Sequence, residues 1–276
     1  MQFGSKPSPG VIFDCSMGDT IDDPLALALL YGLQGKGESR VAGVTTSKPC
    51  LASAAFCDLL VRFYTGDPGP FGVPSAIGMA TSGTDTKETP LLTVPLAKPN
   101  YVRGVRKLND TADPVAVIRN GLTAQFDQNA IVVMTGAPTN LAGFLALPEA
   151  KELIREKVRL LCTTTEPPAG WPGPIVIAPK ELGEALPFPA AALEKDFAWA
   201  PQHPIVDAWR AADPALHDAP STALAAALYA VRPDHGYFKL ANRTLSFDPA
   251  QKDKVLQAYV ELAATKPVPR RGRRGG

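Results

Sequence analysis

Four carboxyl groups and a serine hydroxyl lie within residues 14–23, near the start of the chain. They belong to Asp14, Ser16, Asp19, Asp22 and Asp23. Carboxylates accept hydrogen bonds from hydroxyl groups, bind cations and transfer protons. Their density in this short stretch predicts a site for a polar ligand.

The segments on either side of these residues place them at the edge of a sheet. The apolar run Val11–Phe13 predicts the end of a buried strand, and a helix is expected to begin at Asp22-Asp23-Pro24. Proline suits the first helical turn because its missing N–H costs nothing there, and acidic residues oppose the positive end of the helix dipole. In open α/β sheets, ligands bind beyond the carboxyl ends of the strands, which is where this turn would lie.

Strand-like and helix-like segments alternate along the rest of the chain. Further strands are expected at residues 41–46, 130–134, 158–162, 174–178 and 245–247, and helices at 24–33, 51–64, 113–126 and 149–157. Strands separated by helices imply right-handed crossovers between parallel strands. The prediction is an α/β fold with an open, mostly parallel, Rossmann-like sheet and helices on both faces. Residues 78–101 lack periodicity and predict a long loop, a kind of segment that often has a functional role.

Length allows one or two domains, and composition is typical of a soluble globular protein. The chain has 276 residues and a net charge of +1, which indicates neither a nucleic-acid partner nor a membrane partner. We expect a single domain over residues 1–266 and a disordered basic tail over residues 267–276. Homo-oligomerisation is left open.

Targeting signals and cysteine usage favour a cytoplasmic location. The N-terminus has no apolar core of signal-peptide length, and no stretch is long enough to span a membrane. The four cysteines include no closely spaced pair, so they are expected to be reduced and mostly buried.

Two motifs resemble those of one enzyme family. Asp14-Cys15-Ser16-Met17-Gly18, followed by Asp22-Asp23-Pro24-Leu25-Ala26, is similar to the Asp-Thr-Asp-(Pro or Ile)-Gly and Asp-Asp-Ala-Leu-Ala motif of inosine-uridine-preferring nucleoside hydrolases. Thr135-Gly136-Ala137-Pro138-Thr139-Asn140 resembles the family's Thr-Gly-Pro-Leu-Thr-Asn, and the likeness extends from Val11 to about Phe238. The resemblance implies the nucleoside hydrolase fold and a calcium-dependent glycosidase that cleaves the N-ribosidic bond of ribonucleosides.

The resemblance also implies roles for individual residues. Calcium would be held by Asp23 and by the backbone carbonyl of Thr135. Asp14 and Asp19 are close enough in sequence to serve as substitute ligands. Asp22 and Asn140 would bind the ribose of a nucleoside or of another ribose-containing small molecule. No side chain is assigned as catalytic, and Ser16 stands at the family's general-base position.

The chain departs from the family at several of these positions. Ser16 replaces an aspartate, and Cys50 replaces an asparagine that reaches the ribose. A C-terminal calcium ligand aligns with Ala223, while a rival register places His217-Asp218 there. The family's Glu-x-Asn element is missing after the strand at residues 158–162, where Glu166 is the remaining acid.

Three hypotheses follow. The chain is a nucleoside hydrolase with rearranged ligands, or it is a catalytically inactive homologue that binds a nucleoside or a protein. The third hypothesis is a phosphatase of the haloacid dehalogenase type with Asp14 as its nucleophile. It ranks last because that chemistry needs a second aspartate two residues on, where Ser16 stands.

Overall fold

The strands form one open sheet. The computed structural model describes residues 7–66 and 76–267, and these contain an eight-stranded sheet with the order β3-β2-β1-β4-β5-β6-β8-β7. The strands are β1 (Gly10–Cys15), β2 (Arg40–Thr46), β3 (Ile77–Met79), β4 (Ala130–Met134), β5 (Val158–Thr163), β6 (Ile175–Ile177), β7 (Lys239–Ala241) and β8 (Thr244–Ser246). Neighbouring strands run parallel except β7 and β8, which are antiparallel. The predicted mostly parallel α/β sheet is therefore confirmed.

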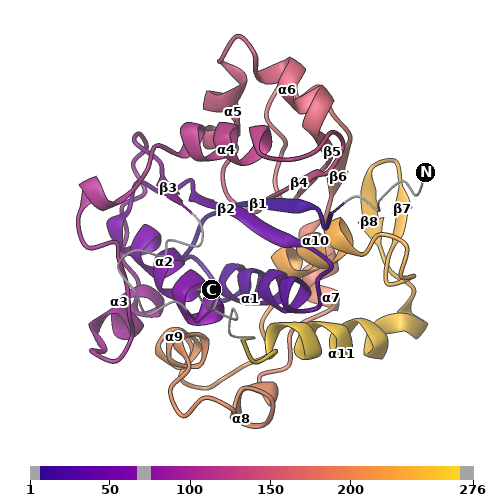
Figure 1. Ribbon diagram of the computed structural model, residues 1–276. Coiled ribbons are helices and arrows are strands. Elements are labelled where there is room, and N and C mark those ends of the chain that lie inside the picture. Colours follow the sequence, from indigo (N-terminus) through magenta and orange to yellow (C-terminus); the bar gives the residue numbers. More distant parts are fainter. Residues whose placement is uncertain (1–6, 67–75, 268–276) are drawn as a thin grey trace, which may run out of the picture.

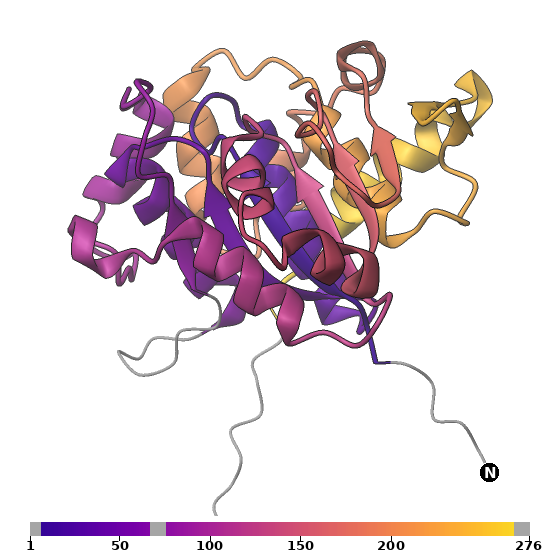
Figure 2. The same ribbon diagram turned by 90° about the horizontal axis from the view of Figure 1, so that it is seen from above.

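Helices cover both faces of this sheet (Figure 1). The helices are α1 (Asp22–Gly35), α2 (Leu51–Thr65), α3 (Pro90–Ala97), α4 (Pro114–Thr123), α5 (Thr139–Leu145), α6 (Ala150–Lys157), α7 (Lys180–Ala185), α8 (Ala192–Lys195), α9 (Pro204–Ala212), α10 (Thr222–Val231) and α11 (Lys252–Ala263). Short 3-10 turns span Leu108–Asp110 and Pro249–Gln251. Helices α4, α5 and α6 lie on one face, and α1, α2, α10 and α11 lie on the other; Figure 2 shows the first group crossing in front of the strands.

The central strands serve two hydrophobic cores at once. Successive side chains of a strand point to opposite faces, so Ile12 packs with the core under α4–α6 while Phe13 packs with the larger core on the other face. Val132 and Val133 on β4 divide in the same way. Burial on both faces explains why these strands are continuous apolar runs without polar alternation.

Helix α1 is apolar around its whole circumference because other elements enclose it. It begins at Asp22, as the sequence predicts, with Asp23 and Pro24 in its first turn. On its far side α11 approaches so closely that a Cβ added to Gly32 would lie 2.1 Å from the backbone oxygen of Leu262. The helix lies between the sheet and this outer helix, so it has almost no solvent-facing side.

The structure corrects one sequence prediction and leaves others outside the described residues. Residues 78–101 are not one long loop, because they include the end of β3 and the helix α3, whose Leu91 and Leu92 are buried. The helix was missed because a stretch of eight residues that contains Pro95 is too short to show clear periodicity. Residues 80–89 between β3 and α3 are irregular, as predicted. The basic tail lies outside the described residues apart from its first residue, Pro267.

The cysteine and membrane expectations can be compared with the described part of the chain. All four cysteines are buried and free, as expected. Within residues 7–66 and 76–267, the helices are too short or too polar to cross a lipid bilayer.

Candidate functional site

The acidic stretch lies at the point where the order of the strands reverses. From β1 the chain continues to β2 and β3 on one side, and from β4 it continues to β5 and β6 on the other. In such sheets, ligands usually bind at this switch point, at the carboxyl ends of the two strands, which here are β1 and β4. The residues assigned from the sequence meet there, and we refer to them as the switch-point cluster: Asp14, Ser16, Asp22, Asp23, Thr135 and Asn140.

Asp14 ends β1 and is fully buried. Its Oδ1 accepts hydrogen bonds from Thr45 Oγ1 (2.6 Å) and Asn140 Nδ2 (2.8 Å), while its Oδ2 is buried with no hydrogen-bond partner among the described residues. Burial raises the pKa of Asp14 to about 7, although the two hydrogen bonds favour the charged form. Full burial also keeps Asp14 from attacking a phosphate ester, which counts against the phosphatase hypothesis.

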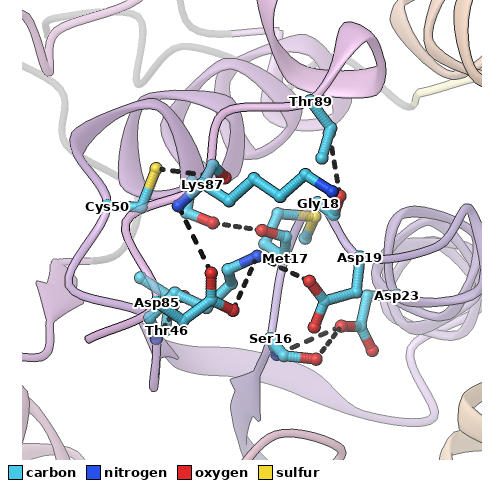
Figure 3. Close-up of polar contacts among 12 residues, drawn as sticks. Ser16, Met17, Gly18, Asp19, Asp23, Thr46, Cys50, Asp85, Lys87 and Thr89 are labelled. Carbon is cyan, nitrogen blue, oxygen red and sulfur yellow. Dashed lines mark hydrogen bonds and ion pairs between the residues drawn. The ribbon is translucent and has the colours of Figure 1, made fainter. Parts of the chain in front are cut away.

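Ser16 and Asp23 are bonded to each other. The Ser16 backbone N–H and hydroxyl both donate to Asp23 Oδ2, at 3.1 and 3.4 Å, and Figure 3 shows the two side chains facing each other across the turn. Burial raises the pKa of Asp23 to about 6. The hydroxyl at the family's general-base position thus serves as a donor to the carboxylate, and no other base contacts it among the described residues.

Asp22 caps another helix. Its Oδ2 accepts from the Ala223 N–H at 2.7 Å and its Oδ1 accepts from the Leu224 N–H at 3.2 Å, at the N-terminus of α10. Burial raises the pKa of Asp22 to about 8, while these backbone amides favour the charged form. The same contact places Ala223, one of the two candidates left open by the sequence, against Asp22. Asp218 is instead an exposed residue of an irregular segment and accepts from the Ala190 N–H.

The β4–α5 turn supplies Thr135 and Asn140. The Thr135 N–H donates to the Asp14 carbonyl at 2.8 Å, which fixes the turn against the end of β1. The Thr135 carbonyl accepts from Thr164 Oγ1 at 3.3 Å, so the proposed metal ligand already has a protein donor. Between β5 and β6 the described chain has no helix, which agrees with the missing Glu-x-Asn element, and Glu166 there is exposed.

The oxygen atoms of these residues do not form a ligand set that fits a calcium ion. Calcium takes six to eight oxygens, with carboxylates providing most of the charge. Ser16 and Ala223 stand where the family has carboxylates, and the Asp23 and Thr135 oxygens accept hydrogen bonds from the protein. In the part of the chain that the structure describes, no group of three or more His, Cys, Asp or Glu side chains is placed so that it could hold a metal ion. Asp14, one of the substitute ligands, is held by Thr45 and Asn140.

Lys48, which was not predicted from the sequence, pairs with Asp19 of the same β1–α1 turn. The residue follows β2, and its side chain is only 4% exposed. Its Nζ lies 2.5 Å from Asp19 Oδ1 and 3.1 Å from Asp85 Oδ2. One signal for Lys48 was available in the sequence. It is a lysine two residues after β2, the buried strand that pairs with β1. The partner Asp85 lies in the irregular residues 80–89, so no sequence pattern could show the contact.

Comparison with known proteins identifies the fold. No protein-family model and no curated protein sequence matches the chain. Solved structures match it over nearly its whole length: the type III effector protein XopQ complexed with adenosine diphosphate ribose (13% identity, TM-score 0.69, 96% of each chain), an inosine-uridine-preferring nucleoside hydrolase from Bacillus anthracis (13%, 0.65, 93% of this chain and 99% of that one), and an inosine-guanosine nucleoside hydrolase (13%, 0.63, 92% and 98%).

The chain therefore has the nucleoside hydrolase fold, which these enzymes share with the XopQ effector. At 13–14% identity the likeness establishes the fold alone. What the protein does depends on its own site residues.

Proposed function

We propose that this protein binds a ribose-containing small molecule at the switch-point cluster and does not cleave N-ribosidic bonds by the calcium route. The observation that carries the proposal is the pairing of the cluster's own groups: Ser16 donates to Asp23, and Asp22 accepts from the amides of α10. A carboxylate that stabilises a helix terminus and a hydroxyl that donates to a carboxylate are not organised to hold a metal and activate water.

The same residues retain features that suit sugar recognition. Ser16 and Asp22 are half-buried, so they are the cluster members through which a ligand can gain access. Carboxylate, amide and hydroxyl groups at the carboxyl edge can exchange hydrogen bonds with ribose hydroxyls. The ligand class is supported by the matched structures, one of which is a complex with adenosine diphosphate ribose and two of which are nucleoside hydrolases.

Calorimetric titration with adenosine diphosphate ribose, inosine, uridine and free ribose tests this proposal. We expect at least one of these to bind with equal affinity in EDTA and in calcium, and we expect ribose release from inosine and uridine to stay at background. Calcium-dependent ribose release would instead support the hydrolase with rearranged ligands. Absence of binding by all four compounds would refute the proposed ligand class.

A pair of variants locates the binding site. Ser16→Leu fills the half-buried entrance to the cluster and is expected to weaken binding about tenfold or more, because one lost hydrogen bond and a steric clash together exceed about 1.4 kcal/mol. Ser246→Leu on the edge of β8, where Ser246 is exposed, is the matched control and should leave affinity unchanged. Equal effects of both substitutions would place the ligand elsewhere.

A further inference from the structure

A single lysine bridges the β1–α1 turn to residues 80–89. Strand β2 runs beside β1, and the Ser47 N–H donates to the Cys15 carbonyl at 2.8 Å, so the chain leaving β2 lies directly against the turn that leaves β1. The Lys48 ammonium, two residues after β2, pairs with Asp19 on the β1–α1 turn and with Asp85 in residues 80–89. Three chain segments far apart in sequence therefore meet at one positive charge.

Residues 80–89 have other contacts with the same turn. Thr89 Oγ1 donates to the Gly18 carbonyl at 2.9 Å, and the Cys50 thiol lies 3.9 Å from the Lys87 carbonyl. Figure 3 shows Asp85, Lys87 and Thr89 arranged along one side of the turn. Residues 81–88 are themselves exposed. Hydrogen bonds and ion pairs of this kind order an exposed irregular segment that has few buried contacts.

The Lys48 ammonium has the properties of a bound cation. Burying an ammonium costs several kcal/mol unless it is paired, and here two carboxylates on different segments provide the pairing. Burial lowers the pKa of Lys48, but Asp19 and Asp85 raise it above its ordinary value, so the side chain stays charged. The negative charge of Asp19 also acts on Asp23 in the switch-point cluster. The positive charge of Lys48 thus pairs with Asp19, and the charge of Asp19 in turn acts on Asp23.

We propose that the Lys48 ammonium is the resident cation of this edge of the sheet, holding the β1–α1 turn and residues 80–89 together in the way that a bound divalent ion would. The inference goes beyond the proposed function, because it concerns how the site is organised and not what it binds. It predicts that the native protein needs no divalent cation, and that removing the ammonium creates a place that a divalent cation can fill.

Two substitutions separate a cationic role from a packing role. Lys48→Ala removes the charge and leaves space between Asp19 and Asp85, whereas Lys48→Met removes the charge but fills the space. Both are expected to lower the melting temperature in EDTA by about 3–6 °C, from the usual relation between stability and melting temperature in a chain of this size. Millimolar CaCl₂ should restore at least half of the loss in Lys48→Ala and none of it in Lys48→Met. The native protein should melt at the same temperature in EDTA and in calcium.

Control variants and a second readout complete the test. Lys36→Ala breaks an exposed pair with Glu261 and should shift the melting temperature by less than about 1 °C in either buffer. Should Lys48→Ala fail to fold, Asp85→Asn retains the lysine and alters a half-exposed side chain. It is expected to speed amide hydrogen exchange in residues 82–89 about tenfold or more.

Three results would overturn the inference: a calcium-dependent melting temperature in the native protein, no recovery of Lys48→Ala in calcium, or unchanged exchange in Asp85→Asn. None of these measurements uses a ribose-containing ligand. Failure here therefore leaves the proposed binding function standing, and failure to bind ribose compounds leaves this inference standing.

Discussion

At the scale of single residues, the cluster differs from a metal site in what its carboxyl groups contact. Asp14 accepts hydrogen bonds from Thr45 and Asn140. Asp22 accepts them from the amides of α10, and Asp23 accepts them from Ser16. Burial raises the pKa of all three above the ordinary value for aspartate. Buried carboxyl groups without a metal are stable where protein donors or protons satisfy them.

These raised pKa values predict that stability falls as pH rises. Asp14 has a pKa of about 7 when folded and near 4 when unfolded, so the folded protein binds more protons between these values. Stability from this group is fully present below pH 4 and is lost as pH rises to about 7. Between pH 5 and 8 we expect Asp14 to account for a loss of about 2–3 kcal/mol in the free energy of unfolding.

Urea unfolding at pH 5 and pH 8 measures this loss. Asp14→Asn retains an acceptor for Thr45 and Asn140 but cannot titrate, so its stability should change less over the same interval. Asp22 and Asp23 also have raised pKa values, so some slope should remain. An equal slope in the native protein and in Asp14→Asn would show that Asp14 ionises normally.

At the scale of secondary structure elements, the site depends on close contacts between neighbouring segments. The β4–α5 turn can approach β1 because a Cβ on Gly136 would lie 2.7 Å from the Cys15 carbonyl carbon. Farther from the site, Gly32 allows α11 to lie against α1, whose first turn carries Asp22 and Asp23. Small residues at such places set how near two elements can come.

Substitution of two helical glycines tests how much the close contact between α1 and α11 matters for stability. Gly32→Ala places a methyl group against the Leu262 carbonyl and should destabilise the protein by about 1–3 kcal/mol, because overpacking outweighs the gain in helix propensity. Gly143→Ala in α5 meets only the Val115 side chain, at 3.2 Å, and should be close to neutral. Guanidinium unfolding of both variants gives the comparison, and equal stabilities would mean that α11 can move away from α1 at little cost.

At the scale of the whole molecule, β1 and β4 couple the two hydrophobic cores. Because neighbouring residues on these strands belong to different cores, neither core can lose its packing without affecting the sheet. The single domain over residues 1–266 remains a prediction from the sequence. A shared central sheet supports cooperative unfolding.

We expect one thermal transition for the whole domain. Phe56→Leu on α2 and Phe144→Leu on α5 alter different cores, and each should lower the same melting temperature by about 2–5 °C through lost packing. Differential scanning calorimetry checks this result through equality of the calorimetric and van't Hoff enthalpies. A transition that splits in one variant only would indicate two units that unfold separately.

Patterns along the chain predicted the fold class and the edge of the sheet at which the candidate site residues lie. Continuous apolar runs such as Ala130–Met134 predict strands buried on both faces, and Asp22-Asp23-Pro24 predicts where α1 begins, because local propensity and hydrophobic pattern are properties of neighbouring residues. The short helix α3 was missed for the same reason, since eight residues give too little pattern.

The contacts of each polar group follow from tertiary packing and not from local sequence. Asp22 reaches amides two hundred residues away in α10, and Lys48 pairs with Asp19 and Asp85 from two other segments. The choice of Ala223 over Asp218 beside Asp22 came from the same packing. Hydrogen bonds and ion pairs between distant segments depend on the relative placement of whole elements, and no pattern along the chain records that placement.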